Sequence, residues 1–98
     1  MFATIRKYQG KKGTLDEVAK HVQAELVPLL SSQPGFVSYT AIDAGNDVAV
    51  SVSVFHDRAS GEAANKVAAQ WVKDHVGASV GTPEISTGEV VATSDLEL

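Results

Sequence analysis

Runs of β-branched and aromatic residues recur four times along the chain and are typical of β-strands. They cover residues 2–8, 36–43, 48–55 and 84–92, and Gly88 interrupts the last of them. The third run alternates most clearly, with valine at each even position from 48 to 54 and small or mixed residues at the odd ones. Because neighbouring side chains of a strand point to opposite faces, this strand has one wholly apolar face and one face of a different character.

Two further segments carry apolar residues at the spacing of amphipathic helices. The first begins at Thr14, where Thr14-Leu15-Asp16-Glu17 matches a capping box. Pro28 lacks an amide and crowds the preceding turn, so we expect this helix to kink or tighten near Val27 and to stop within residues 31–35. Its apolar positions are Leu15, Val18, Ala19, Val22, Leu26 and Leu29. The second helix is rich in alanine, follows Asp57 as a candidate cap and reaches residue 76.

Residues 44–47 join the second and third strands, and Gly45 and Asn46 within them tolerate positive φ, which predicts a hairpin. The complete order is β-α-β-β-α-β. Right-handed crossovers then give an antiparallel four-stranded sheet with both helices on one face, the ferredoxin-like arrangement of the α+β class. We expect one domain over residues 1–92 and a frayed C-terminal tail over residues 93–98.

The sheet face that the helices leave uncovered also carries apolar residues, because the strands are apolar in both parities. Phe2 and Ile5 have opposite parity in the first strand, as do Val54 and Phe55 in the third. Two such sheets packed face to face about a two-fold axis would bury this surface. We therefore expect a homodimer.

Composition narrows the classes of function. Ninety-eight residues, of which 44% are hydrophobic and 20% charged, suit one globular domain. The net charge of −4 lacks the basic excess of nucleic-acid-binding proteins, so we expect no nucleic acid partner. The chain has no cysteine, which excludes a disulfide, a thiolate metal site and a cysteine nucleophile. No apolar run reaches the roughly 18 residues that span a bilayer, and no signal-peptide pattern is present, so we expect a cytoplasmic protein without a membrane partner.

The Pro34-Gly35-Phe36 start of the second strand, together with the capped first helix, the hairpin and the alanine-rich second helix, resembles the antibiotic-biosynthesis-monooxygenase-like family of dimeric α+β barrels. The resemblance covers about residues 2–92. It implies a homodimer whose two sheets form a barrel and, in active relatives, a pocket between helices and sheet. Some relatives oxygenate aromatic polyketides without a cofactor, and others degrade haem.

The sequence departs from the motifs of both active groups. Haem-degrading relatives use an asparagine on the first strand, a tryptophan on the second helix and a histidine about three turns later. This chain has Ile5-Arg6 on the strand, and its His75 follows Trp71 by one turn. The polyketide oxygenases place asparagine, tryptophan and tyrosine around the substrate. Asn65 and Trp71 share the second helix here, but no tyrosine follows them, and we expect no cofactor.

Trp71 and His75 lie one turn apart on the second helix, so their side chains share one side of it and are candidates to line a cavity. The alternative is that Trp71 is a central core residue, with His75 at the edge of that core. His56 closes the third strand, where the carboxylate of Asp57 would favour a charged imidazole. It is a candidate base, or alternatively an exposed turn residue.

Arg6 and Tyr39 lie in the middle of the first and second strands, where such side chains are unusual. A buried arginine needs an anionic ligand or a carboxylate partner, and Glu89 on the last strand is the candidate partner. The pattern does not decide whether Arg6 and Tyr39 face the helices or the opposite side.

Glu17, His21 and Glu25 form a stripe along the first helix. Without a ligand from another element such a stripe would hold a metal ion only loosely, so it suits a solvated surface better than a metal site. We expect no metal ion.

Together these features predict a monooxygenase-like domain that binds a small apolar or aromatic ligand, with cofactor-independent oxygenation as the candidate reaction. In that reaction Trp71 would position the substrate, His75 or His56 would act as base, and Arg6 or Tyr39 would hold an oxyanion. The alternative is a homodimeric module without chemistry, either ligand-binding or structural and linked to stress. A cavity beside Trp71 favours the first interpretation, and a packed interior favours the second.

Overall fold

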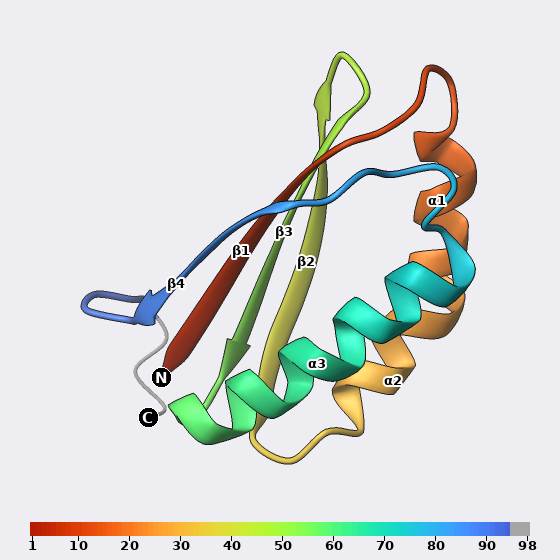
Figure 1. The fold of residues 1–98 in the computed structure, drawn as a ribbon. Helices are drawn as coiled ribbons and strands as arrows, with labels where there is room; N and C mark the ends of the chain where they lie inside the picture. Colours follow the sequence, from red (N-terminus) through yellow and green to blue (C-terminus); the bar gives the residue numbers. More distant parts are fainter. Residues whose placement is uncertain (95–98) are drawn as a thin grey trace.

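The computed structural model describes residues 1–94, which form an antiparallel sheet with helices along one side (Figure 1). The strands are β1 (Phe2–Gln9), β2 (Phe36–Gly45), β3 (Val48–Phe55) and β4 (Glu84–Glu89). The helical segments are α1 (Leu15–His21), η1 (Val22–Leu26), α2 (Val27–Ser31) and α3 (Arg58–His75). Of the predicted tail, residues 95–98 lie outside the described part of the chain. Within residues 1–94, no helix is long and apolar enough to cross a membrane.

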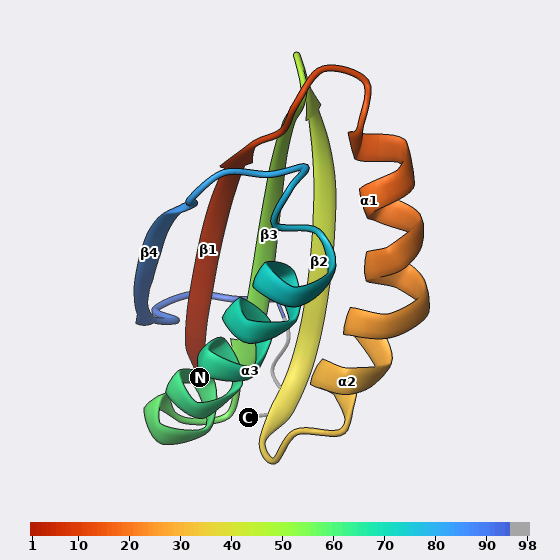
Figure 2. The same ribbon diagram turned by 45° about the vertical axis from the view of Figure 1, so that its right-hand side comes forward.

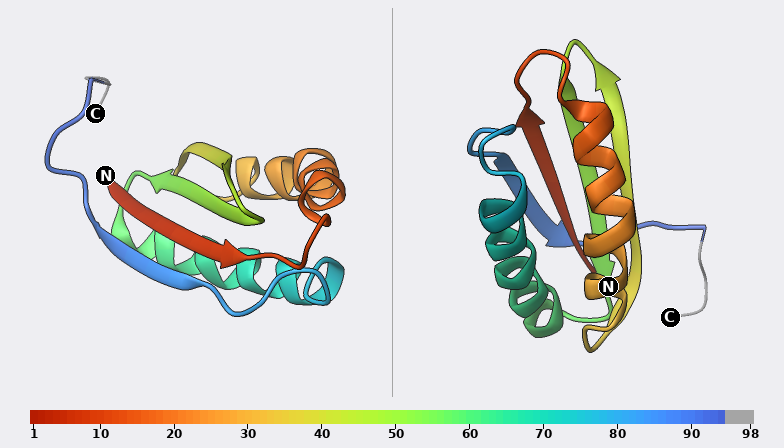
Figure 3. Two further views of the ribbon diagram at one scale, coloured as in Figure 1. Left: turned by 90° about the horizontal axis from the view of Figure 1, so that it is seen from above. Right: turned by 90° about the vertical axis from the view of Figure 1, so that its right-hand side faces the viewer.

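Neighbouring strands pair antiparallel in the order β2-β3-β1-β4. α3 packs against β1 and β3, and α2 packs against β2, so the helices cover one face of the sheet (Figure 3). This arrangement confirms the predicted ferredoxin-like α+β fold. The domain boundary at residue 92 stays a prediction.

Three strand boundaries differ from those predicted, the first being that of β1, which ends at Gln9 rather than at Tyr8. β2 continues to Gly45, and its connection to β3 is only Asn46 and Asp47, whose φ angles are 53° and 62°. Two consecutive positive φ values are typical of the type I′ turn, whose twist matches that of the paired strands. β4 runs without interruption through Gly88, which pairs with β1, and it ends at Glu89 rather than at residue 92.

The first helix contains a π-helical turn that was not predicted. α1, η1 and α2 follow one another without a break, and the amide of Val27 donates to the carbonyl of Val22, five residues earlier. Pro28 has no amide with which to continue the ladder, and the helix widens before it rather than tightening. The extra residue in the wide turn rotates the turn that follows, so Leu30 is fully buried and Leu29 only partly.

The two helix starts have different outcomes. Thr14 makes no capping bond to α1, because its hydroxyl donates to the carbonyl of Lys11 at 2.7 Å, so the predicted capping box is wrong. Asp57 caps α3 as predicted, accepting from the amide of Ser60 at 2.8 Å and from its hydroxyl at 3.2 Å. These hydrogen bonds to the carboxylate hold the pKa of Asp57 below its usual value.

The two faces of β3 have different surroundings. The residues at 51, 53 and 55 are buried beneath the helices, and the valines at 48, 50, 52 and 54 lie on the opposite face. In register beside these valines, Ile5 pairs with Val52 and Ile42 pairs with Val50. Ile5 and Ile42 remain 45% and 48% exposed. We call this apolar outer surface, made of the four valines, Ile5 and Ile42, the valine face.

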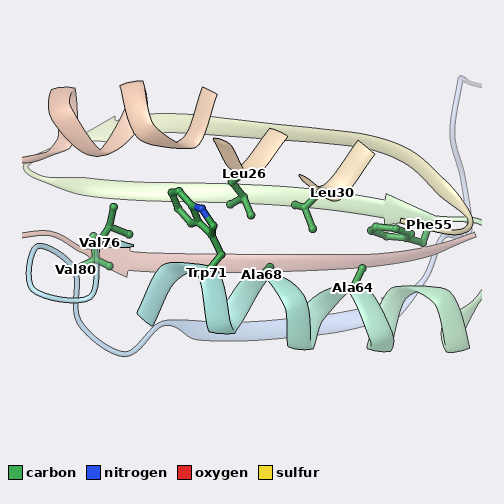
Figure 4. Close-up of a cluster of buried hydrophobic side chains, with 8 residues drawn as sticks. All are labelled: Leu26, Leu30, Phe55, Ala64, Ala68, Trp71, Val76 and Val80. Carbon is green, nitrogen blue, oxygen red and sulfur yellow. The ribbon is translucent and has the colours of Figure 1, made fainter. Parts of the chain in front are cut away.

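The hydrophobic core lies between α3, α2 and the helix side of the sheet (Figure 4). Its buried members are Leu26, Leu30, Phe55, Ala64, Ala68, Trp71, Val76 and Val80. α3 lies close to β1 at Gly61, where an added Cβ atom would lie only 2.4 Å from the ring of Phe2. Ala64 and Ala68 are buried on the same face of α3, and their small side chains allow this helix to pack closely against the sheet.

We expect the valine face to be covered by a second copy of the chain, because an isolated domain would leave it in water. Light scattering at micromolar concentration should give twice the chain mass of 10.3 kDa. Val52→Asp, which places a charge in the middle of this face, should give a monomer, whereas Ala69→Asp on the exposed side of α3 should remain dimeric. A monomeric wild-type protein would contradict this prediction.

Candidate functional site

A cavity of about 460 Å³ lies between the helix side of the sheet and the first helix. Small side chains make its floor, since Ala49 and Ser51 on β3 and Ala41 on β2 leave space that larger residues would fill. Apolar side chains make its walls: Leu15, Val18, Val22 and Leu26 from the first helix, Ala68 and Val72 from α3, and Val76 and Val80 from the residues after it. Figure 2 shows α1 standing beside β2, with α3 running across β1 and β3. We call this space the helix–sheet cavity.

The mouth of the helix–sheet cavity lies between α1 and β2. Ala19, Gln23 and Ala41 line the cavity there and are exposed to solvent. Asp16 and Asp43 line it as well and are also exposed. The mouth therefore carries two carboxylates among small and apolar side chains, and the exposed Ile42 is also one of the lining residues.

Arg6, Tyr8 and Tyr39 bring polar groups into the helix–sheet cavity. The strand register places Arg6 beside Ser51, with Tyr8 two residues further along β1 and Tyr39 on β2. Arg6 and Tyr39 thus face the helices. The sequence pattern had left open which face of the sheet they occupy. Tyr8 was not predicted as a site residue, although it shares the parity of Arg6, and that parity is the signal that identifies it.

The guanidinium of Arg6 is buried without a carboxylate. Arg6 is only 4% exposed, and its one hydrogen bond within residues 1–94 runs from Nη2 to the backbone oxygen of Asn65 at 3.4 Å. Glu89 pairs in register with Phe2, about 13 Å along the strand from Arg6 at 3.3 Å per residue. The predicted ion pair between Arg6 and Glu89 does not form, and in the described residues Arg6 makes no other.

Both tyrosines of the cavity are neutral at neutral pH. Burial raises the pKa of Tyr8, with the charge of Arg6 opposing this effect and Tyr39 adding to it. Burial also raises the pKa of Tyr39, against the opposing effects of the Ser51 hydrogen bond and the charge of Arg6. A neutral phenol keeps its O–H donor. Tyr8 and Tyr39 can therefore donate to a ligand oxygen in the cavity.

Asn65 joins α3 to β1 next to Arg6. Its side-chain amide donates to the hydroxyl of Thr4 at 2.8 Å, and its backbone oxygen receives the Arg6 hydrogen bond. Thr4 is fully buried. A single asparagine in an alanine-rich helix marks this position in the sequence, and its two hydrogen bonds tie α3 to the strand that carries Arg6.

Trp71 and His75 lie together but outside the helix–sheet cavity. Their rings stack with centroids 5.0 Å apart, and Nδ1 of His75 lies 3.0 Å from the backbone oxygen of Trp71. Trp71 is 6% exposed, and Figure 4 shows its indole projecting from α3 toward Leu26 within the core. The two side chains instead line an open groove of about 480 Å³ on the outer surface of α2 and α3, together with Leu29 and Lys66. The structure thus places Trp71 in the core and His75 at its edge.

The remaining candidates lie on the surface. His56 is exposed at the end of β3, and its backbone amide donates to Gly35 at 2.8 Å. His21 lies 3.9 Å from a carboxylate oxygen of Glu17 and 3.3 Å from one of Glu25. Glu25 also lies 3.7 Å from Nε2 of His75, so this stripe does reach a second helix. Within residues 1–94, no group of acidic, histidine or cysteine side chains is arranged to hold a metal ion.

Sequence comparison supplies the family. The model of the antibiotic biosynthesis monooxygenases matches residues 1–70. The chain belongs to this family. The matched range includes the first helix and the three strands that carry Arg6, Tyr8, Tyr39 and Ser51, and it stops one residue before Trp71. No curated protein matches the chain.

Solved structures share the monooxygenase-family fold at low sequence identity. NE2512, a protein of unknown function from Nitrosomonas europaea, has a TM-score of 0.80 and 21% identity over 94% of this chain and 90% of that chain. SnoaB, a cofactor-independent oxygenase from Streptomyces nogalater, has a TM-score of 0.74 and 16% identity over 96% of each chain. MhuD, a haem degrader from Mycobacterium tuberculosis with two haems bound in its active site, has a TM-score of 0.73 and 18% identity over 95% and 98%. At these identities the likeness shows the fold alone.

Trp71→Ala should lower the free energy of unfolding by ~3–5 kcal/mol, because it removes a buried indole and leaves a hole in the core. Denaturant unfolding at one fixed protein concentration measures this loss, since the stability of a dimer depends on concentration. His75→Ala is the control. Its side chain is 44% exposed, and its removal should cost less than ~1 kcal/mol. An equally small loss for Trp71→Ala would contradict the core role and favour Trp71 as a ligand-binding residue.

Proposed function

We propose that this member of the antibiotic biosynthesis monooxygenase family binds a small apolar or aromatic molecule in the helix–sheet cavity. The observation that supports this function is the cavity itself, at about 460 Å³ and with largely apolar walls. Sites for small organic ligands are typically concave, apolar and ~300–1,000 Å³ in volume, with a few polar groups that fix the orientation of the ligand. Arg6, Tyr8 and Tyr39 supply such groups here.

Cofactor-independent oxygenation is the candidate reaction, and the likeness to SnoaB favours it. Of the residues expected to act in it, Trp71, His75 and His56 do not line the helix–sheet cavity and have no part in the site proposed here. Arg6 and Tyr39 do line it and are placed to hold a developing oxyanion. The cavity thus offers binding and anion stabilisation from its own residues. Ligand binding is therefore the main function that we propose. Oxygenation of the bound ligand would be detected as oxygen consumption in the presence of a substrate.

Binding can be measured with phenylnaphthylamine, an uncharged aromatic probe that fluoresces when it leaves water. We expect saturable fluorescence enhancement with the wild-type protein. Ala49→Phe places a ring on the cavity floor, in the space that the probe would occupy. It should therefore weaken binding by at least ~10-fold. Ala69→Phe adds the same ring to the exposed side of α3 and should leave binding unchanged.

Two results would contradict the proposed site. The first is a wild-type protein with no saturable binding. The second is equal binding by Ala49→Phe and wild type, with both variants shown to be folded by circular dichroism, since the probe would then occupy another surface such as the valine face.

Haem is expected to remain intact in the presence of the protein and a reductant. The first strand has Arg6 and no asparagine, and His75 lies on the outer surface away from the cavity. The absorbance of added haem should therefore show no enzyme-dependent loss. A loss of the haem spectrum that disappears in His75→Ala would contradict this expectation.

A further inference from the structure

We infer that the ligand of the helix–sheet cavity carries an anionic oxygen group, a carboxylate or an ionised phenol or enol, and that this group binds the guanidinium of Arg6. The inference rests on the proposed binding function and adds the chemical class of the ligand. The rest of the ligand is an apolar or aromatic body held by the walls of the cavity.

The first step is the burial of a permanent charge. Arginine stays protonated in proteins, so Arg6 cannot escape the cost of burial by losing its proton. Buried charges are paired or hydrogen-bonded, because an uncompensated one is strongly destabilising. Arg6 has five N–H donors, of which one makes a long 3.4 Å hydrogen bond in the described residues. The other guanidinium nitrogens have no protein partner within residues 1–94 and are not enclosed by protein atoms, so they reach the accessible space of the cavity.

The second step is the position of that charge. Arg6 lines the helix–sheet cavity, so its guanidinium is open to the space where a ligand would lie. Tyr8 and Tyr39 line the same space and carry neutral phenols that can donate further hydrogen bonds to an anionic oxygen. Three donor side chains from β1 and β2 thus line a cavity whose walls on the helix side are largely apolar. This division is typical of a site for an amphipathic organic anion.

The third step concerns the carboxylates of the protein that could have paired with Arg6 in place of a ligand. Asp16 and Asp43 line the mouth, but neither forms an ion pair with Arg6, and Asp43 accepts from the amide of Gly45 at 2.9 Å. Both are exposed and hydrated. Their charges would repel a second anionic group at the mouth, so the ligand carries its single negative group at the inner end and a neutral end outward.

Two probes that differ in one group test the inference. Anilinonaphthalene sulfonate has the ring system of phenylnaphthylamine with an added sulfonate, which stands in for the anionic oxygen group of the ligand. The wild-type protein should bind the sulfonate more tightly. Arg6→Met should weaken sulfonate binding by ~10-fold or more while leaving the neutral probe within about twofold, because a hydrogen-bonded charge pair is lost and the apolar walls remain. Lys20→Met, the same change of charge on the exposed side of α1, should alter neither.

The unfolding midpoint in denaturant is the second readout, and it keeps the test decisive if binding is weak. Without ligand, Arg6→Met should have a midpoint at or above that of the wild type, because a buried charge without a partner has been removed. A clearly lower midpoint would mean that Arg6 is compensated within the protein, and it would overturn the inference. Arg6→Lys keeps a positive charge but loses the planar fork, so it should retain part of the preference for the sulfonate.

The outcomes separate this inference from the proposed function. If both probes bind to the cavity with equal strength and Arg6→Met changes neither, the cavity binds neutral molecules and the inference fails alone. If neither probe binds the wild type, the proposed function fails. If Arg6→Met weakens both probes equally, Arg6 shapes the cavity rather than recognising charge, and the inference fails.

Discussion

The burial of the Arg6 guanidinium is the constraint on which the interior depends. A permanent cation on the helix side of the sheet cannot be surrounded by tightly packed apolar side chains, because the loss of hydration would not be offset. The neighbouring residues match this requirement, with Ser51 beside Arg6 in the sheet and Tyr8 and Tyr39 facing the same space. The helix–sheet cavity gives this charge accessible space, and the charge gives the cavity a chemical preference.

The space around this charge exists because the two helices pack against the sheet in different ways. α3 lies close to the sheet, because Gly61, Ala64 and Ala68 present almost no side chain toward it, and Asn65 fixes it to β1 through Thr4. The first helix is buried mainly near its C-terminal end, through Leu26 and Leu30, while α1 contains no buried residue and roofs the cavity. The π-helical turn lies between these two parts, and Val22 and Leu26 within it line the cavity.

Much of this arrangement could be predicted from the sequence, and the failures have physical causes. The element order, the Asp57 cap and the unusual character of Arg6 and Tyr39 are local or periodic features, so they were predicted. Which face of the sheet the helices cover is a tertiary choice, and the wholly valine side of β3 turns out to face outward. The π-helical turn depends on bonding that Pro28 only partly dictates, and the distance between Arg6 and Glu89 depends on strand register. The cavity itself arises from small residues on neighbouring strands, which the pattern of a single strand does not reveal.

A crystal structure of the protein with bound anilinonaphthalene sulfonate would test most directly whether Arg6 recognises an anion. The account predicts a sulfonate oxygen within ~3 Å of the Arg6 guanidinium, with the ring system beneath α1 against the apolar walls. It would be contradicted by a structure in which Arg6 contacts a protein carboxylate while the probe lies on the valine face or with its sulfonate at the mouth of the cavity.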